Sequence, residues 1–204
     1  MDYRQKITEE AAMMFRTYGI RAVTMDMLAS RLGISKRTIY EVFRDKDELL
    51  RGVLKWMMLK QKEVMKKILG DSENVIEAIF KMLDIMIDHI TFMSPAFQLD
   101  IRRYHREFME NLSSAEEIPF YQDNTEIIKK GIKEGLFRED IDIEITNKCI
   151  TEMSKISYDK NVNSPYDLPD KDILRNFYIN YLRGISTQKG LDLINHYEKM
   201  KVRS

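Results

Sequence analysis

The sequence predicts an all-α fold, and three observations support this prediction. Along most of the 204 residues, apolar side chains recur at intervals of three and four, the spacing that places them on one face of a helix. No segment shows the sustained apolar–polar alternation that a half-buried strand would produce. Only 8 Gly and 4 Pro interrupt the chain, so turn signals are few and long helices are favoured.

Four helices are predicted in the first seventy residues, over residues 3–18, 24–32, 35–43 and 45–70. Good N-cap residues begin the last three helices, and glycines end the first two: the caps are Thr24, Ser35 and Asp45, and the stops are Gly19 and Gly33. The two short middle helices are therefore joined by a tight turn.

Longer helices are predicted in the rest of the chain, over residues 74–93, 95–112, 120–134, 143–158, 171–187 and 189–200. The pattern changes character near Gly70, where the short helices and the long fourth helix give way to this longer array. We expect an N-terminal domain of residues 1–61 and a C-terminal helical domain of residues 62–204.

The charge is balanced overall, with 33 Lys+Arg against 33 Asp+Glu, but it is unevenly distributed. Residues 1–70 hold 15 Lys+Arg and 9 Asp+Glu, so 15 − 9 = +6, and residues 71–204 hold 18 and 24, so 18 − 24 = −6. A basic N-terminal part is typical of a nucleic-acid-binding head, although the Lys-rich helix after residue 50 alone could account for it.

Several classes of protein are disfavoured by composition. A single cysteine, Cys149, excludes an intramolecular disulfide framework and a Cys-rich metal site. No apolar run approaches the length of a membrane span, and the N-terminus has no signal-peptide core. We expect a cytoplasmic protein that does not act on a membrane, with no cofactor and no metal.

The stretch most indicative of function is residues 24–43, TMDMLASRLGISKRTIYEVF. It predicts a helix, a tight turn and a second helix with a polar outer face, the helix-turn-helix arrangement that places its second helix in the major groove of DNA. The candidate DNA-binding residues are Thr24, Ser35, Lys36, Arg37, Thr38, Tyr40 and Lys46.

These candidates have different expected roles. Arg37 is suited to a bidentate contact with guanine, and the Tyr40 hydroxyl is suited to a phosphate. Thr24 and Lys46 stand at the starts of flanking helices, where side chains position the protein rather than read sequence.

The stretch from Ile7 to Leu50 resembles the DNA-binding domain of the tetracycline-repressor (TetR) family of bacterial regulators. The matching positions are Phe15, Gly19, Thr24, Ala29, Leu32, Gly33, Ser35, Thr38, Tyr40, Phe43, Lys46 and Leu49. Arg37 departs from the small residue of many relatives, which bears on the operator that is read. A weaker similarity to the family's second domain lies in residues 128–144, IKKGIKEGLFREDIDIE.

The resemblance implies an effector pocket among the C-terminal helices and a dimer in which the last two long helices pack against their twofold mates. Methionine and aromatic residues are concentrated in the helices predicted over residues 74–93 and 95–112. Because methionine is an adaptable lining for apolar cavities, these residues favour a hydrophobic or aromatic effector, although residues of this kind more often form the hydrophobic core. The pocket candidates are Met82, Met86, His89, Met93, Phe97, Tyr104 and Phe108. The interface candidates are Cys149, Ile150, Met153, Phe177, Tyr178, Tyr181, Leu182 and Ile185.

These observations predict a homodimeric transcriptional repressor that binds a palindromic double-stranded operator and leaves it when a small molecule binds. Two alternatives stay open. One is a constitutive regulator or activator without a ligand, and the other is a helical enzyme with a vestigial DNA-binding head. The sequence offers no nucleophile–base pair or metal-binding spacing that supports the enzyme.

Overall fold

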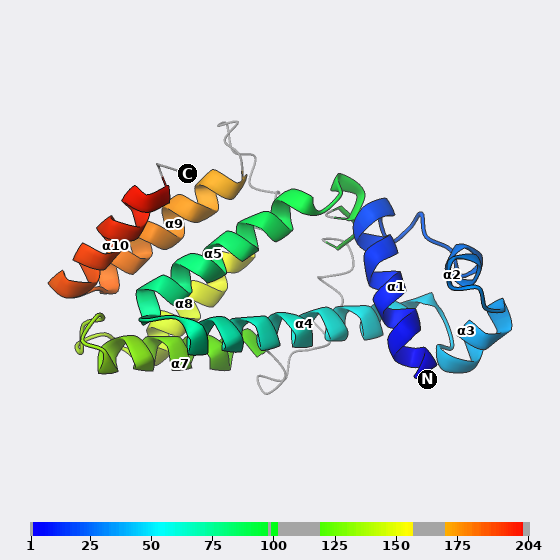
Figure 1. Cartoon of the computed structure of the whole chain (residues 1–204), viewed down its shortest axis with the longest axis horizontal. Coiled ribbons are helices and arrows are strands. Elements are labelled where there is room, and N and C mark those ends of the chain that lie inside the picture. Colours follow the sequence, from blue (N-terminus) through cyan, green and yellow to red (C-terminus); the bar gives the residue numbers. More distant parts are fainter. Residues whose placement is uncertain (1, 98, 102–118, 157–169, 202–204) are drawn as a thin grey trace. The chain divides into compact units, whose positions relative to one another are not determined.

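The computed structural model describes residues 2–97, 99–101, 119–156 and 170–201. Within these ranges the secondary structure is helical, and the one β-type pairing is an isolated bridge between Phe137 and Ser186. The helices are α1 (Tyr3–Tyr18), α2 (Met25–Leu32), α3 (Lys36–Val42), α4 (Lys46–Asp71), α5 (Val75–Phe92), α7 (Pro119–Lys133), α8 (Ile143–Ile156), α9 (Asp170–Ile185) and α10 (Gln188–Lys201) (Figure 1). The predicted all-α fold is confirmed.

One predicted helix is only partly covered. Of residues 95–112, those at 95–97 and 99–101 are helical, and the others lie outside the described residues. No described helix is long and apolar enough to cross a membrane.

The described residues form two compact units, and the division between them falls after Gln61, inside α4. The first unit also contains the described residues from Phe92 to Ile101, and the second contains residues 62–91 and the described residues after 118. The domain limits of 1–61 and 62–204 stay a prediction. The described residues from 92 to 101 lie within the predicted second domain, but they belong to the same unit as the N-terminal helices.

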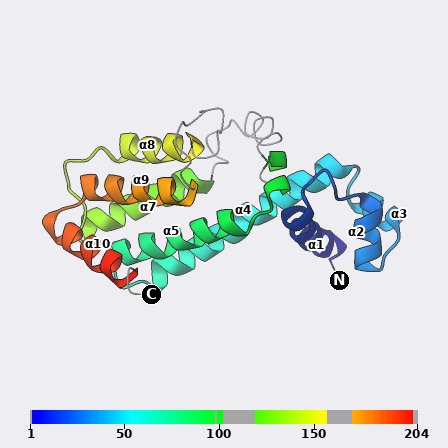
Figure 2. The ribbon, with the colours of Figure 1, turned by 90° about the horizontal axis from the view of Figure 1, so that it is seen from above.

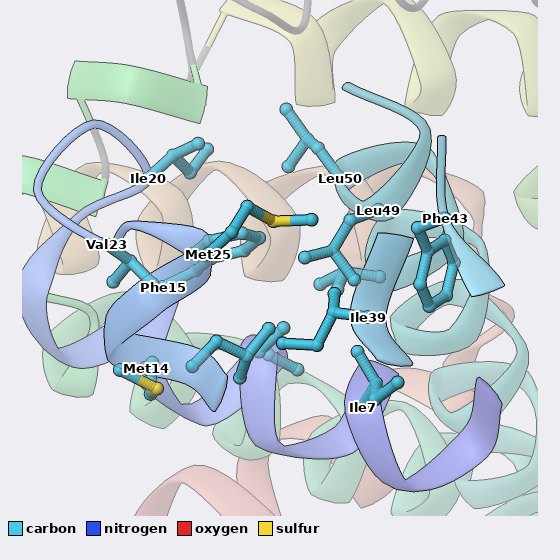
Figure 3. Close-up of a cluster of buried hydrophobic side chains, with 14 of the residues drawn as sticks. Ile7, Met14, Phe15, Ile20, Val23, Met25, Ile39, Phe43, Leu49 and Leu50 are labelled. Carbon is cyan, nitrogen blue, oxygen red and sulfur yellow. The ribbon is translucent and has the colours of Figure 1, made fainter. Parts of the chain in front are cut away.

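The first unit is built around a core from α1 to α4 in which Ile7, Phe15, Leu28, Ile39 and Phe43 are fully buried (Figure 3). Phe97 joins the same core and is only 1% exposed. Burying a large apolar side chain contributes about 1.5–3 kcal/mol to the free energy of unfolding, so this cluster holds α1, α2 and α3 in place.

The second unit packs α7 against α8 and α10 against α9 (Figure 2). Its core comes mainly from α5, α9 and α10 and from the turn after α7. In that turn Gly135 has a φ of +67°, and the ring of Phe137 lies so close to Gly131 that an added Cβ would come within 2.1 Å of it. This turn and the end of α7 therefore approach each other closely within residues 128–144.

Candidate nucleic-acid interface

The turn between α2 and α3 is fixed by hydrogen bonds of the backbone and of the cap residues. Thr24 Oγ1 accepts from Met27 N at 3.2 Å, and Ser35 Oγ accepts from Thr38 N at 3.1 Å. At the end of α2, Gly33 adopts φ +66°, and the N–H groups of Gly33 and Ile34 bond back to Ser30 and Ala29. This is the Schellman arrangement, which needs a residue that tolerates the left-handed conformation.

The inner side of α3 is anchored to the core and its last turn to α1. Ile39 is fully buried, and Arg4 donates to the Val42 carbonyl at 2.6 Å while its guanidinium lies 4.4 Å from the centre of the Phe43 ring. Arg4 is also 3.5 Å from a carboxylate oxygen of Glu48. Since Arg4 satisfies a terminal carbonyl of α3, it fixes the direction in which the helix points.

The outer side of α3 carries the predicted recognition residues. The Arg37 side chain is 89% exposed, the Lys36 side chain is 48% exposed and Tyr40 is 45% exposed. Ser35 and Thr38 cap the start of the helix and share a hydrogen bond between their hydroxyls at 2.9 Å. The fold therefore brings these five sequence-predicted residues together on one short helix and its cap.

Acidic partners accompany the cations of this surface, a feature that sequence reasoning missed. Lys36 Nζ lies 2.6 Å from Asp26 Oδ2, and Arg37 Nε lies 3.0 Å from Glu41 Oε1. The hydrogen bond to Asp26 raises the pKa of Lys36 above its ordinary value. The spacing of four residues between Arg37 and Glu41 could have indicated their pair, whereas Asp26 lies on another helix.

The positive charge of the N-terminal part lies mainly outside the helix-turn-helix motif and the residues that directly follow it. Residues 24–48 hold five Lys+Arg and five Asp+Glu, so 5 − 5 = 0. Residues 49–70 hold six and one, so 6 − 1 = +5. The positive excess of the N-terminal part thus lies mostly on α4, beyond the helix-turn-helix motif.

Lys46 points into the protein rather than along the outer face of α3. Its Nζ donates to the carbonyl of Val23 at 2.5 Å and to that of Arg21 at 3.3 Å. Burial lowers the pKa of Lys46, and the negative charge of Asp100 partly offsets this effect. Lys46 therefore holds the loop that leads to the Thr24 cap.

Asp100 completes the clamp on the same loop from a distant part of the chain. It is 9% exposed, its Oδ2 accepts from Arg21 N at 2.9 Å, and its Oδ1 is 3.6 Å from Arg21 Nε. Ala96 contacts Gly19, where an added Cβ would lie 2.9 Å from the Ala96 methyl. Nothing local in the sequence indicates these contacts, because the partners lie 79 residues apart.

The predicted pocket residues do not all gather in one place. Met82 and Met86 belong to the second unit, where Met86 packs against its core, while Met93 and Phe97 pack against the core of the first unit. His89 lies on α5, but its side chain lies outside the described set, as do Tyr104 and Phe108 entirely. The structure thus separates these candidates into two groups.

The predicted interface residues also differ in exposure. Cys149 is exposed, and Ile150, Phe177 and Ile185 are half-buried. Leu182 is 4% exposed and belongs to the core of the second unit.

Two tyrosines of the interface set already have partners within the second unit. Tyr181 donates from its hydroxyl to the Thr146 carbonyl at 3.1 Å, and Tyr178 packs against the core of that unit. Met153 lies on α8 with its side chain outside the described set. Sequence reasoning missed two large exposed apolar residues on the same helices, Ile145 at 62% and Ile173 at 45%.

Comparison with known proteins agrees with this geometry. Residues 7–53 match the family model for bacterial regulatory proteins of the tetR family. The chain is 26% identical over 166 residues to the HTH-type transcriptional repressor KstR2 of Mycobacterium tuberculosis, covering 76% of this chain and 78% of that repressor. It is 36% identical over 93 residues to the uncharacterized HTH-type transcriptional regulator YhgD of Bacillus subtilis, covering 44% and 49%.

The fold is shared by solved structures of regulators. A transcriptional regulator from Cytophaga hutchinsonii superposes with a TM-score of 0.70 at 20% identity, covering 90% of this chain and 98% of that one. A TetR-family regulator from Pectobacterium atrosepticum gives a TM-score of 0.69 at 17% identity, covering 91% and 94%. With its helix-turn-helix unit, its exposed third helix and these relatives, the chain carries the DNA-binding domain of the tetR family in residues 7–53 and is a DNA-binding transcriptional regulator.

Proposed function

We propose that the protein is a homodimeric repressor that leaves its operator when a small hydrophobic or aromatic molecule binds its C-terminal unit. The observation that carries the proposal is the exposure of Arg37 and Tyr40 on a helix whose opposite side is buried through Ile39. The repressor relatives that align over three quarters of the chain support repression rather than activation.

In this proposal Arg37 recognises a base and the Tyr40 hydroxyl contacts a phosphate of the DNA backbone. A guanidinium that is 89% exposed can reach the N7 and O6 acceptors of a guanine, a contact that contributes about 1–3 kcal/mol of discrimination. Ser35, Thr38 and Thr24 act mainly through their caps, and Lys46 acts through the loop that it holds. Replacement of Arg37 by alanine is expected to relax base preference at one position of each half-site, and unchanged preference at every position would remove this role.

Dimerisation through α8 and α9 follows from the apolar residues that these helices leave exposed. Ile145 and Cys149 lie one turn apart on α8, and Ile173 lies on α9. A single head buries too little surface for selective binding, whereas two heads about 34–36 Å apart read successive turns of a palindrome. The variants Ile145→Glu and Ile173→Glu are expected to weaken the dimer, and sedimentation that matches the unaltered protein would contradict this interface.

Release by a ligand has a physical route through the chain. Helix α5, which carries Met82 and Met86, is followed along the chain by the described residues from 93 to 101, which belong to the first unit and include Phe97 of its core. Through Asp100 and Ala96 this segment contacts the loop that precedes α2. A ligand that favours one position of α5 over another can therefore bias the position of that loop, to the extent of its differential affinity.

The proposal assigns the chain no catalytic activity. Among the described residues, no group of three His, Cys, Asp or Glu side chains gathers as a metal site would require. The relatives named above are regulators. Chemical turnover of a bound compound by the purified protein would contradict this part of the proposal.

The test uses the purified protein and a DNA fragment that it selects from its source genome. Transcription from a promoter that carries the fragment is expected to fall on addition of the protein and to recover on addition of an organic-solvent extract of the source cells. Protein that has been unfolded, dialysed and refolded serves as the ligand-free control. Repression that no extract relieves would favour the constitutive regulator, and increased transcription would favour an activator.

A further inference from the structure

The recognition helix carries its charges in the order that an isolated helix disfavours. Lys36 and Arg37 lie in the first turn of α3 and Glu41 lies in the last, although the helix dipole favours anions at the start and cations at the end. An Arg that precedes a Glu by four residues is also the weaker orientation of such a pair. Stability of α3 therefore does not explain this arrangement.

The two carboxylates engage the cations without burying them. Glu41 is 59% exposed and contacts an Arg37 side chain that is 89% exposed, and Asp26 is 67% exposed beside a Lys36 side chain that is 48% exposed. Ion pairs this exposed to water add little to folding stability and open readily. They are therefore exchangeable partners for the cations that face DNA.

Similar pairing extends to the other cations of residues 24–48. Arg31 pairs with Glu10 at 3.0 Å and Arg44 with Asp45 at 3.0 Å, while Lys46 binds backbone carbonyls. Since residues 24–48, which comprise the motif and the start of α4, carry no net charge, this stretch offers little of the counterion release that drives sequence-independent binding to DNA.

We propose that Glu41 and Asp26 are specificity-determining residues. On non-cognate DNA these carboxylates stay paired with Arg37 and Lys36 and repel the phosphates. On the operator, groups of the DNA replace the carboxylates as partners of the two cations. The inference rests on the proposed base-reading role of Arg37. On random DNA a phosphate competes with Glu41 for the Arg37 guanidinium, and the Glu41 carboxylate repels that phosphate. Binding of the protein to random DNA is therefore weakened. On the operator a guanine edge offers two acceptors in fixed geometry, which replace Glu41 without placing a phosphate beside it.

The decisive variant is Glu41→Gln, which removes the charge and keeps the shape. Its matched control is Glu9→Gln on α1, where the carboxylate accepts a hydrogen bond from Gln5 and the change in net charge is the same. Affinities are measured by fluorescence anisotropy at several salt concentrations. The probes are a random-sequence duplex and a duplex recovered by genomic selection.

Glu41→Gln is expected to tighten binding to the random duplex about two- to threefold per head, the effect of removing one like charge near a phosphate in water. The ratio of selected-duplex to random-duplex affinity is expected to fall by at least the same factor. Both changes are expected to disappear in an Arg37→Ala background, because a phosphate comes close to Glu41 only when the Arg37 guanidinium attracts it. Asp26→Asn is expected to give the smaller change of the same sign.

Random-duplex affinity equal to that of Glu9→Gln would overturn the proposal, and this comparison requires no operator. Loss of preference for cytosine at one position, with random binding unchanged, would make Glu41 a direct base reader and would also overturn it. An effect that persists in the Arg37→Ala background would do the same. Failure of Arg37 as a base reader is distinguished separately, by an unchanged base preference in Arg37→Ala alone.

Discussion

Asp100→Ala tests the clamp that joins the segment after α5 to the loop before α2. Asp100 is 9% exposed and accepts the backbone N–H of Arg21 at 2.9 Å, and its charge also acts on Lys46. The substitution removes the acceptor and leaves the N–H of Arg21 without its carboxylate partner.

The magnitude follows from these contacts. A hydrogen bond to a charged acceptor contributes about 1.5–3 kcal/mol. The ion pair with the Arg21 side chain, which is 57% exposed, adds only a few tenths of a kcal/mol because water screens it. We therefore expect the free energy of unfolding to fall by about 2–3 kcal/mol and, for a chain of this length, the melting temperature to fall by roughly 4–12 °C.

The assay is thermal unfolding followed by circular dichroism, with two comparison variants. Asp100→Asn keeps an oxygen acceptor and is expected to lose about 1 kcal/mol less than the alanine variant. Asp88→Ala removes an exposed carboxylate of α5 and is expected to change stability by less than about 0.5 kcal/mol. If Asp100→Ala and Asp88→Ala melt together, Asp100 does not clamp the loop and the proposed route of ligand release loses its contact.

Three further predictions concern packing, pH and DNA contact. Gly131→Ala forces the adjacent phenylalanine ring aside and is expected to cost about 1–3 kcal/mol in denaturant unfolding, whereas Gly184→Ala, which meets no atom within 4 Å, is expected to be neutral or slightly stabilising. The pKa of Asp45 is lowered chiefly by the backbone N–H of Glu48, and the pKa of Glu48 chiefly by the backbone N–H of Arg44. The contribution of these two carboxylates to stability is therefore present above the unfolded pKa near about 4 and is lost as the pH falls through the lower folded values. In the double variant Asp45→Asn/Glu48→Gln, the melting temperature is expected to fall less steeply as the pH is lowered. Tyr40→Phe is expected to weaken binding to all duplexes similarly in anisotropy titrations, and a loss confined to particular sequences would reassign Tyr40 to base recognition.

Local signals in the sequence predicted the helices closely. The first helix was predicted over residues 3–18 and lies at Tyr3–Tyr18, and the caps at Thr24 and Ser35 are present with their hydrogen bonds. Apolar spacing and cap chemistry act within a few residues, so one sequence is sufficient to locate them.

Contacts between distant segments could not be predicted in the same way. Phe97 was a pocket candidate because Met and aromatic residues are concentrated around it, and the structure places it in the core of the first unit. Arg4 contacts the end of α3 across 38 residues, and Asp100 contacts Arg21 across 79. Periodicity identifies a buried face of a helix, but it does not indicate which core that face joins.

We infer that the unit containing α3 recognises a specific palindromic DNA sequence as part of a dimer. The most direct test is selection of bound fragments from the source genome by the purified protein at a stated salt concentration. We expect enrichment of a palindrome whose half-sites are about one helical turn apart, or a multiple of it. No enriched sequence, even after the protein has been unfolded, dialysed and refolded to remove bound ligand, would contradict it.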